Sequence, residues 1–162
     1  TMQWLNDNMP AESGKASVIH NDYKMDNVIF SVENPLQVIG VLDWEMATVG
    51  DPLMDLGCPL GYWVETGDPD FFRQYRTMPS DIEGAPTRAE IVARFQEKTG
   101  IAVDNFPFYF CFGLFRLAVI GQQIYYRYYQ GLTKDKRFAM MVKKTHILQQ
   151  MCELIMAGEV RT

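Results

Sequence analysis

Apolar, β-branched runs occur in only one short part of this sequence, and that restriction limits the possible folds more than any other feature. The runs lie at residues 17–19, 28–30 and 38–42. The second and third flank a polar turn that contains Asn34 and Pro35, which is typical of a β-hairpin. No other clear strand pattern follows, so the sequence predicts an α+β fold that is mostly helical and carries one small β-hairpin.

Helix signals replace strand signals after residue 50. Asp51 and Pro52 suit an N-cap followed by the first helical position. Thr87 and Glu90 have the spacing of a capping box. Glycines that follow polar-apolar periodic segments mark helix ends. We expect a helix from residue 52 to Gly57 and another from residue 88 to Gly100. A long helix, capped by Asp104, should run from about Asn105 to Gln130 and stop at Gly131. The last helix should cover residues 134–157 and stop at Gly158.

The composition indicates a folded chain whose partner is a small molecule or a protein. Hydrophobic residues make up 48% of the 162 residues and charged residues 22%, close to the average of globular proteins. The net charge of −5 leaves no broad basic face for nucleic acid. The apolar run 106–121 contains Pro107, Gly113 and Arg116, so we interpret it as a buried helix and expect no membrane span.

Three cysteines, Cys58, Cys111 and Cys152, lie far apart and form no C-x-x-C motif. An odd, scattered set of this kind is typical of reduced and buried thiols. Residues 1–10 lack the basic and apolar pattern of a signal peptide. We therefore expect core-filling cysteines in a cytoplasmic protein.

One polar segment directly after the first strand carries the chemistry. His20, Asp22 and Asn27 have the H-x-D-x-x-x-x-N spacing of a kinase catalytic loop. Such a loop needs a carboxylate that orients the acceptor hydroxyl or takes its proton, and an amide oxygen that holds a magnesium ion. Alone the pattern is weak, because three fixed residues also coincide by chance.

Further acidic residues follow at positions that strengthen the pattern. Asp43 stands at the end of the last strand, where a second acidic ligand completes the oxygen shell of a hard cation. Asp51 and Asp55 lie four residues apart, on one face of the expected helix.

Together these motifs resemble the aminoglycoside phosphotransferase family, which has a protein-kinase-like fold. The resemblance rests on His20-x-Asp22, Asn27, Leu42-Asp43-Trp44 and Gly50-Asp51-Pro52-x-x-Asp55-Leu56. It covers residues 17–57, and the helical remainder agrees in length and class. Among relatives, the sequence looks most like the kinase-like parts fused to acyl-CoA dehydrogenases. That likeness implies a small hydroxylated acceptor, such as a hydroxyacyl thioester.

The resemblance also implies roles. Asp22 would be the catalytic base, and Asn27 and Asp43 would hold Mg²⁺ and, through it, ATP. Lys24 would act near the transferred phosphate, both in catalysis and in nucleotide binding. His20, Asp51 and Asp55 would support the site. The family usually has glycine where this sequence has Asn21, which puts the backbone of the loop in doubt but removes no reacting group.

The same resemblance predicts a lobe organisation. Residues 1–16, with a helical turn at Trp4-Leu5, would end an inter-lobe connection, and residues 17–162 would form the C-terminal lobe. We expect the N-terminal nucleotide-binding lobe to be absent from this chain and the chain alone to have little turnover. A hinge-facing surface with Trp4, Leu5 and Trp44 would then favour self-association.

Other interpretations remain open. The chain could be a non-catalytic pseudokinase or an interaction module, although Asp22, Asn27 and Asp43 disfavour this. A metal-dependent hydrolase fits poorly, because the two histidines, His20 and His146, form no H-x-H or H-E-x-x-H motif.

Several single residues also have a simpler structural interpretation. His20 could be a core histidine, Lys24 a solvated lysine, and Asp51 and Asp55 only helix-terminal charges. The aromatic segment 125–129 is expected mainly in the core. Arg116 must find a carboxylate or line a cleft, where it could bind an acceptor anion.

Overall fold

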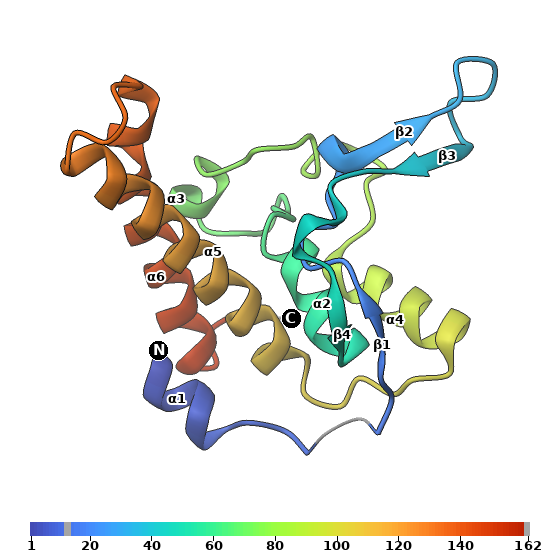
Figure 1. Cartoon of the computed structure of the whole chain (residues 1–162). Helices are drawn as coiled ribbons and strands as arrows, with labels where there is room; N and C mark the ends of the chain where they lie inside the picture. The colour runs from blue at the N-terminus through green and yellow to red at the C-terminus, as the bar shows by residue number, and fades with distance from the viewer. Residues whose placement is uncertain (12–13, 161–162) are drawn as a thin grey trace.

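The computed structural model describes residues 1–11 and 14–160, and within them the chain forms a helical body with two small antiparallel sheets (Figure 1). The fold class predicted from sequence is confirmed. Residues 12, 13, 161 and 162, which belong to the two segments predicted as connection and lobe, lie outside the described residues.

The predicted hairpin is present as strands β2 (Val28–Phe30) and β3 (Val38–Val41). They pair antiparallel, with Val28 opposite Val41 and a register shift between Ile29 and Phe30. The first predicted strand, β1 (Ser17–Ile19), pairs antiparallel with β4 (Thr48–Gly50), which the sequence analysis did not anticipate. Thr48 and Val49 are β-branched, but two such residues before a glycine are too short a run to predict a strand, so β4 depends on its partner.

Helix α2 (Pro52–Leu60) begins as expected, because Asp51 Oδ1 accepts a hydrogen bond from the Leu53 N–H at 2.8 Å. The predicted end at Gly57 is wrong, since the helix continues through this buried glycine to Leu60. A side chain at Gly57 would collide with the backbone of Tyr109. The glycine therefore permits close helix packing and does not end the helix.

The capping box is confirmed at the start of α4 (Arg88–Thr99), where the side chains of Thr87 and Glu90 each accept a hydrogen bond from the other residue's backbone N–H. The helix ends at Gly100, which has a φ of +68°. The long helix α5 (Phe106–Tyr129) is also confirmed, but Asn105 occupies its N-cap position, so the cap assignment to Asp104 is wrong. Pro107, which lacks an N–H, lies in its first turn and fits there without a side-chain cap.

The last predicted helix is divided into a 3-10 helix, η3 (Lys136–Met140), and α6 (Met141–Met156). The remaining elements of the described residues are two short α-helices, α1 (Met2–Asp7) and α3 (Asp70–Arg73), and two 3-10 helices, η1 (Met25–Asn27) and η2 (Trp44–Met46). None of the helices within the described ranges combines the length and apolar character that crossing a membrane requires.

The core lies around α5, which packs between α2 and α6 (Figure 1). The interior residues of α5 include Phe108, Phe110 and Leu114, which are almost completely buried. The three cysteines are free thiols and are buried in the same region, as predicted. Leu5 also belongs to this core, so α1 is fixed to the helical body by its apolar side chain.

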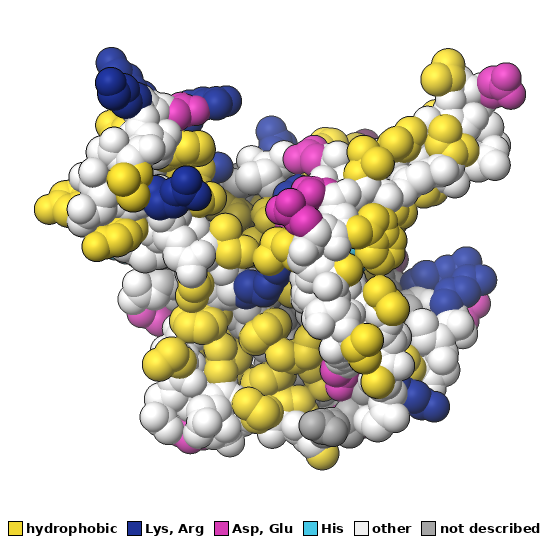
Figure 2. Space-filling view, viewed as in Figure 1, with side chains coloured by type: hydrophobic (Ala, Val, Ile, Leu, Met, Phe, Trp, Pro, Cys, Tyr) yellow, Lys and Arg dark blue, Asp and Glu magenta, His cyan; other side chains and the backbone are white. Residues whose placement is uncertain are grey.

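An apolar surface remains on the two small sheets and the segment between them. Val18 and Val49, which face each other across β1 and β4, are 68% and 71% exposed, and Trp44 is 50% exposed. Figure 2 shows hydrophobic side chains along the β2–β3 hairpin as well. Of the residues predicted on a hinge-facing surface, Trp44 is exposed, whereas Leu5 is buried because α1 packs on α5.

Candidate active site

His20 connects the segment after β1 with the segment after β3. Its side chain is only 3% exposed, and Nε2 lies 2.7 Å from the Leu42 carbonyl oxygen. The Asp22 backbone N–H donates to Nδ1 at 3.2 Å. These two partners fix the tautomer, because Nδ1 must accept and Nε2 must therefore donate. The ring also packs against Trp44, with 4.6 Å between the ring centroids.

Asp55 holds the same loop from the side of α2. Its carboxylate accepts the His20 backbone N–H at 2.9 Å and the Asn21 backbone N–H at 2.7 Å. Hydrogen bonds to a charged acceptor are stronger than neutral ones, so one side chain fixes two consecutive peptide groups. Asp51, one helical turn earlier, caps α2.

Asn21 adopts a left-handed conformation with φ 65°, and its side-chain amide donates to the Met46 carbonyl oxygen at 2.9 Å. Asparagine tolerates this region better than most residues other than glycine. Asn21 therefore keeps a glycine-type backbone in the loop and adds a bond that glycine lacks. Asp43 is the other non-glycine residue with positive φ, at 67°, among the described residues.

The carboxylate of Asp22 lies at the centre of a polar cluster. Lys24 Nζ is 2.6 Å from Asp22 Oδ2, and the Asn27 amide donates to the same oxygen at 3.2 Å. The Asn27 amide also donates to the Asp22 backbone carbonyl at 2.9 Å. On the other side, the Tyr62 hydroxyl donates to Asp22 Oδ1 at 3.4 Å. The structure thus brings together three predicted site residues and one additional tyrosine.

Tyr62 is the residue that sequence reasoning missed. Burial and then the neighbouring Asp22 carboxylate raise the pKa of its phenol well above the usual value, so the hydroxyl stays protonated and donates. Lys24 Nζ lies 5.5 Å from the centroid of its ring, within the range of a cation–π contact. No local motif marks Tyr62, which is 40 residues from Asp22 in sequence.

Asn27 and Asp43 supply the oxygen atoms that suit Mg²⁺. The Leu42 backbone N–H donates to the backbone carbonyl oxygen of Asn27 at 2.8 Å, and the Leu42 carbonyl oxygen is hydrogen-bonded to His20. Asp43 directly follows Leu42, so these two bonds hold its segment beside Asn27. The Asn27 amide nitrogen is committed to Asp22, which leaves its side-chain oxygen as the atom for a cation. One carboxylate and one amide fit an ion that keeps substrate phosphates and water in its shell. Among the described residues, no group of three or more acidic, histidine or cysteine side chains could hold a metal ion.

Comparison with known families agrees with this geometry. A model of the phosphotransferase enzyme family (APH) matches residues 1–91, more than half of the chain. The chain belongs to this phosphotransferase family. The family resemblance inferred from the sequence motifs is therefore confirmed.

A solved structure from Ralstonia eutropha, assigned as an aminoglycoside phosphotransferase, matches this APH chain with a TM-score of 0.81 and 28% identity. The match covers 99% of this chain and 48% of the other. Mouse acyl-CoA dehydrogenase family member 10 is 33% identical over 94% of this chain, and human family member 11 is 32% identical over 80%. This chain spans only 14% and 16%, respectively, of the length of these two relatives.

Arg116 of this APH chain lies beside the segment that follows β3. Its Nη2 is 3.6 Å from the Met46 sulfur, and Met46 accepts the Asn21 amide through its backbone. Burial raises the pKa of the nearby Cys58 thiol to about 11, against the opposing effect of the Arg116 charge. Arg116 thus lies on the side of α5 that faces the candidate site, and anion binding there stays a prediction.

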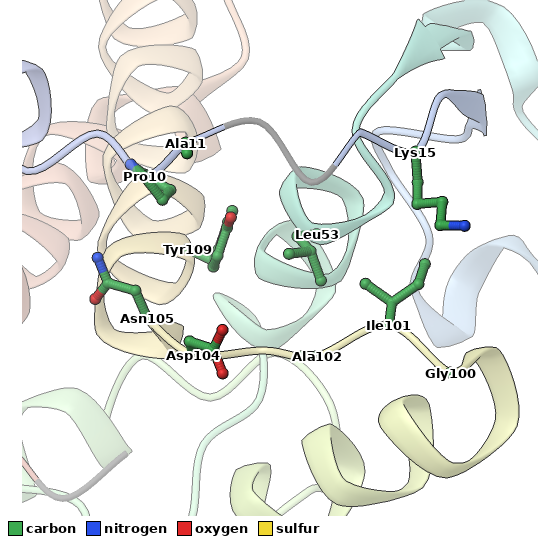
Figure 3. A pocket seen from close by; sticks show the side chains of 10 residues that line it. All are labelled: Pro10, Ala11, Lys15, Leu53, Gly100, Ile101, Ala102, Asp104, Asn105 and Tyr109. Atoms are coloured by element: carbon green, nitrogen blue, oxygen red, sulfur yellow. The ribbon is translucent and has the colours of Figure 1, made fainter.

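A separate pocket of about 430 Å³ lies between the first turn of α2 and the loop that leads from Gly100 to Asn105 (Figure 3). Leu53, Asp104 and Tyr109 are among its lining residues. None of the predicted site residues lines it. The pocket is therefore separate from the cluster around Asp22.

Proposed function

We propose that this chain forms the catalytic and acceptor-binding lobe of an ATP-dependent phosphotransferase that acts on a hydroxyl group of a small molecule. The observation that supports this most is the Asp22 carboxylate, which is surrounded by Lys24, Asn27 and Tyr62 on a loop that His20 and Asp55 hold in place. Phosphoryl transfer depends mainly on positioning and electrostatic stabilisation, and a fixed loop of this kind supplies positioning.

In the proposed reaction, Asp22 accepts the proton of the acceptor hydroxyl as the bond from that oxygen to the γ-phosphorus forms. The bond from the γ-phosphorus to the bridging oxygen breaks, and ADP leaves with the electron pair. Lys24 is paired with Asp22 in this structure. We propose that it turns toward the transferred phosphate when nucleotide binds, which frees Asp22 for the acceptor.

Asn27 and Asp43 would hold Mg²⁺, which when bound offsets the negative charge of the nucleotide phosphates. The side-chain oxygen of Asn27 and the exposed carboxylate of Asp43 are the atoms assigned to this task. His20, Asp51 and Asp55 would act by positioning and would not touch the reacting atoms.

The acceptor that we propose is a hydroxyacyl thioester. Support comes from relatives that are named acyl-CoA dehydrogenase family members, with 32–33% identity to this chain. The exposed surface around Val18, Val49 and Trp44 is the proposed contact for a nucleotide-binding lobe or for a second copy of the chain.

The experiment uses the natural full-length gene product with ATP, Mg²⁺ and a panel of hydroxylated compounds that includes hydroxyacyl thioesters and aminoglycosides. Product formation is followed by ³¹P NMR and by the mass of the phosphorylated acceptor. Phosphate transfer to a hydroxyl in the wild type and its loss in the variant Asp22→Asn would support the proposal. Transfer that persists unchanged in Asp22→Asn would overturn it.

A further inference from the structure

A small pocket lies between helices α5 and α6, close to the candidate active site but outside it. Its volume is about 160 Å³. Helix α5 contributes Leu117, Ile120 and Ile124, which follow one another on one face. Gly121 of α5 also lines the pocket, and the remaining lining residues, from α6 and from the segments after α2 and α3, are Tyr62, Tyr75, Thr77, Met141, Lys144, Thr145 and Leu148.

The polar groups of this lining are largely engaged within the protein. The Thr145 hydroxyl donates to the Met141 carbonyl oxygen at 3.0 Å. Lys144 Nζ lies 5.9 Å from the centroid of the Tyr75 ring. Burial raises the pKa of the Tyr75 phenol to about 12, so this side chain stays neutral. The interior of the pocket therefore favours an apolar group.

Tyr62 links this pocket to the candidate active site. The same side chain lines the pocket and donates a hydrogen bond from its hydroxyl to Asp22 Oδ1. The pocket and the proposed base therefore share Tyr62 as a common neighbour. A molecule with its hydroxyl at Asp22 and an apolar extension along Tyr62 would reach both.

We infer that the pocket between α5 and α6 is a subsite for an apolar tail on the hydroxyl acceptor, with Tyr62 as the wall that places the hydroxyl at Asp22. The inference rests on the proposed function for the identity of the reacting group. A cavity of about 150 Å³ lined by Leu, Ile and Phe holds benzene, so a pocket of this size accommodates a tail of about six carbon atoms. Such a subsite selects against polycationic sugars, because they offer no apolar group to fill it.

The first test measures how the wild-type, natural full-length gene product responds to tail length. The probes are 3-hydroxyacyl thioesters of N-acetylcysteamine with straight acyl chains of increasing length. Equilibrium binding is measured by calorimetry, and kcat/KM is measured for phosphorylation. Each added methylene that enters the pocket should raise the affinity about fourfold, and the increase should end at a tail of about six carbons.

The second test changes the pocket itself. The variant Ile124→Trp fills it, and Gln123→Trp adds the same side chain at the neighbouring exposed position on α5, outside the lining. Filling should lower the ratio of long-tail to short-tail kcat/KM at least about tenfold, which is the contribution of about two of the methylene groups that the pocket would otherwise hold. Gln123→Trp should leave this ratio unchanged. Thermal unfolding of both variants checks that they fold. If Ile124→Trp does not fold, Ile124→Ala replaces it, and this variant should extend the preferred tail length.

The outcomes separate this inference from the proposed function. Tail-dependent binding without phosphorylation of any thioester would support the subsite and contradict the proposed function. Phosphorylation with equal kcat/KM and equal affinity at every tail length would support the proposed function and overturn the subsite. Equal responses of Ile124→Trp and Gln123→Trp would also overturn it, because the effect would not depend on the pocket.

Discussion

Gly57 of α2 and Gly113 of α5 meet backbone to backbone. A Cβ atom placed on Gly113 would lie 2.1 Å from the Gly57 carbonyl oxygen. No side-chain rearrangement relieves a contact with backbone, so the two helices are as close as this pair of glycines permits. Because Asp55 lies on α2 and holds the catalytic loop, the helix contact also sets the position of the candidate site.

The first prediction concerns this helix contact. Gly113→Ala should lower the free energy of unfolding by about 3 kcal/mol, because α2 and α5 must separate to admit one methyl group. Urea unfolding measures the change. Gly67→Ala is the matched control, since nothing lies within 4 Å of a Cβ atom at that position. Equal stability of the two variants would contradict the close packing.

The second prediction concerns the two aspartates of α2. Asp55→Asn should lower stability by about 2 kcal/mol, because an amide oxygen accepts less strongly and its NH₂ group faces an N–H donor. Activity should fall as well, since the His20 and Asn21 peptide groups lose their anchor.

Asp51→Asn is the comparison for that variant. Asparagine caps helices about as well as aspartate, so stability should change by less than about 0.5 kcal/mol. Chemical unfolding and kcat are measured for both variants. A larger loss of kcat in Asp51→Asn than in Asp55→Asn would contradict the assignment of loop support to Asp55.

The third prediction concerns the left-handed residue Asn21. Asn21→Ala should be about 1 kcal/mol less stable than Asn21→Gly, because alanine disfavours positive φ and glycine does not. Both variants lose the bond to the Met46 carbonyl, so the difference isolates the backbone term. Thermal unfolding provides the comparison, and equal stabilities would show that the loop does not need this conformation.

Local signals explain why part of the fold could be predicted from sequence. The hairpin, the capping box at Thr87 and the end of α4 at Gly100 each depend on a few adjacent residues, so their patterns are readable. The end of α2 is not local. Gly57 has the character of a helix stop, but contact with α5 makes it an interior residue.

The residues of the candidate site also divide into those that local sequence patterns predict and those that depend on tertiary contacts. Asp22, Asn27 and Asp43 follow from motif spacing, and the structure places their segments together through His20 and Leu42. Tyr62 and strand β4 depend on tertiary contacts with partners 40 and about 30 residues away, which no spacing rule contains. Their positions could only come from the folded chain.

The fourth prediction concerns alkaline pH. Burial raises the pKa of Cys58 from 9.0 to about 11, so the folded state favours the protonated thiol. A raised pKa contributes stability that is present below pH 9 and is lost as pH rises toward 11. The loss should be on the order of 2 kcal/mol. Cys58→Ala should reduce this loss between pH 9 and 10, whereas Tyr75, whose pKa is raised from 10 to about 12, should still weaken the fold between pH 10 and 12.

The last prediction separates the base from the nucleotide contacts. Asp22→Asn in the natural full-length gene product should lower kcat by about 10²–10⁴-fold, because proton transfer from the acceptor loses its carboxylate. The dissociation constant for Mg²⁺–ATP should change little, since the base acts on the acceptor. Asp43→Asn, in contrast, should weaken Mg²⁺-dependent nucleotide binding, because a carboxylate ligand is replaced by an amide. Calorimetry with ATP and Mg²⁺ distinguishes the two variants, and an equal loss of nucleotide affinity in both would show that Asp22 belongs to the metal site and is not the base.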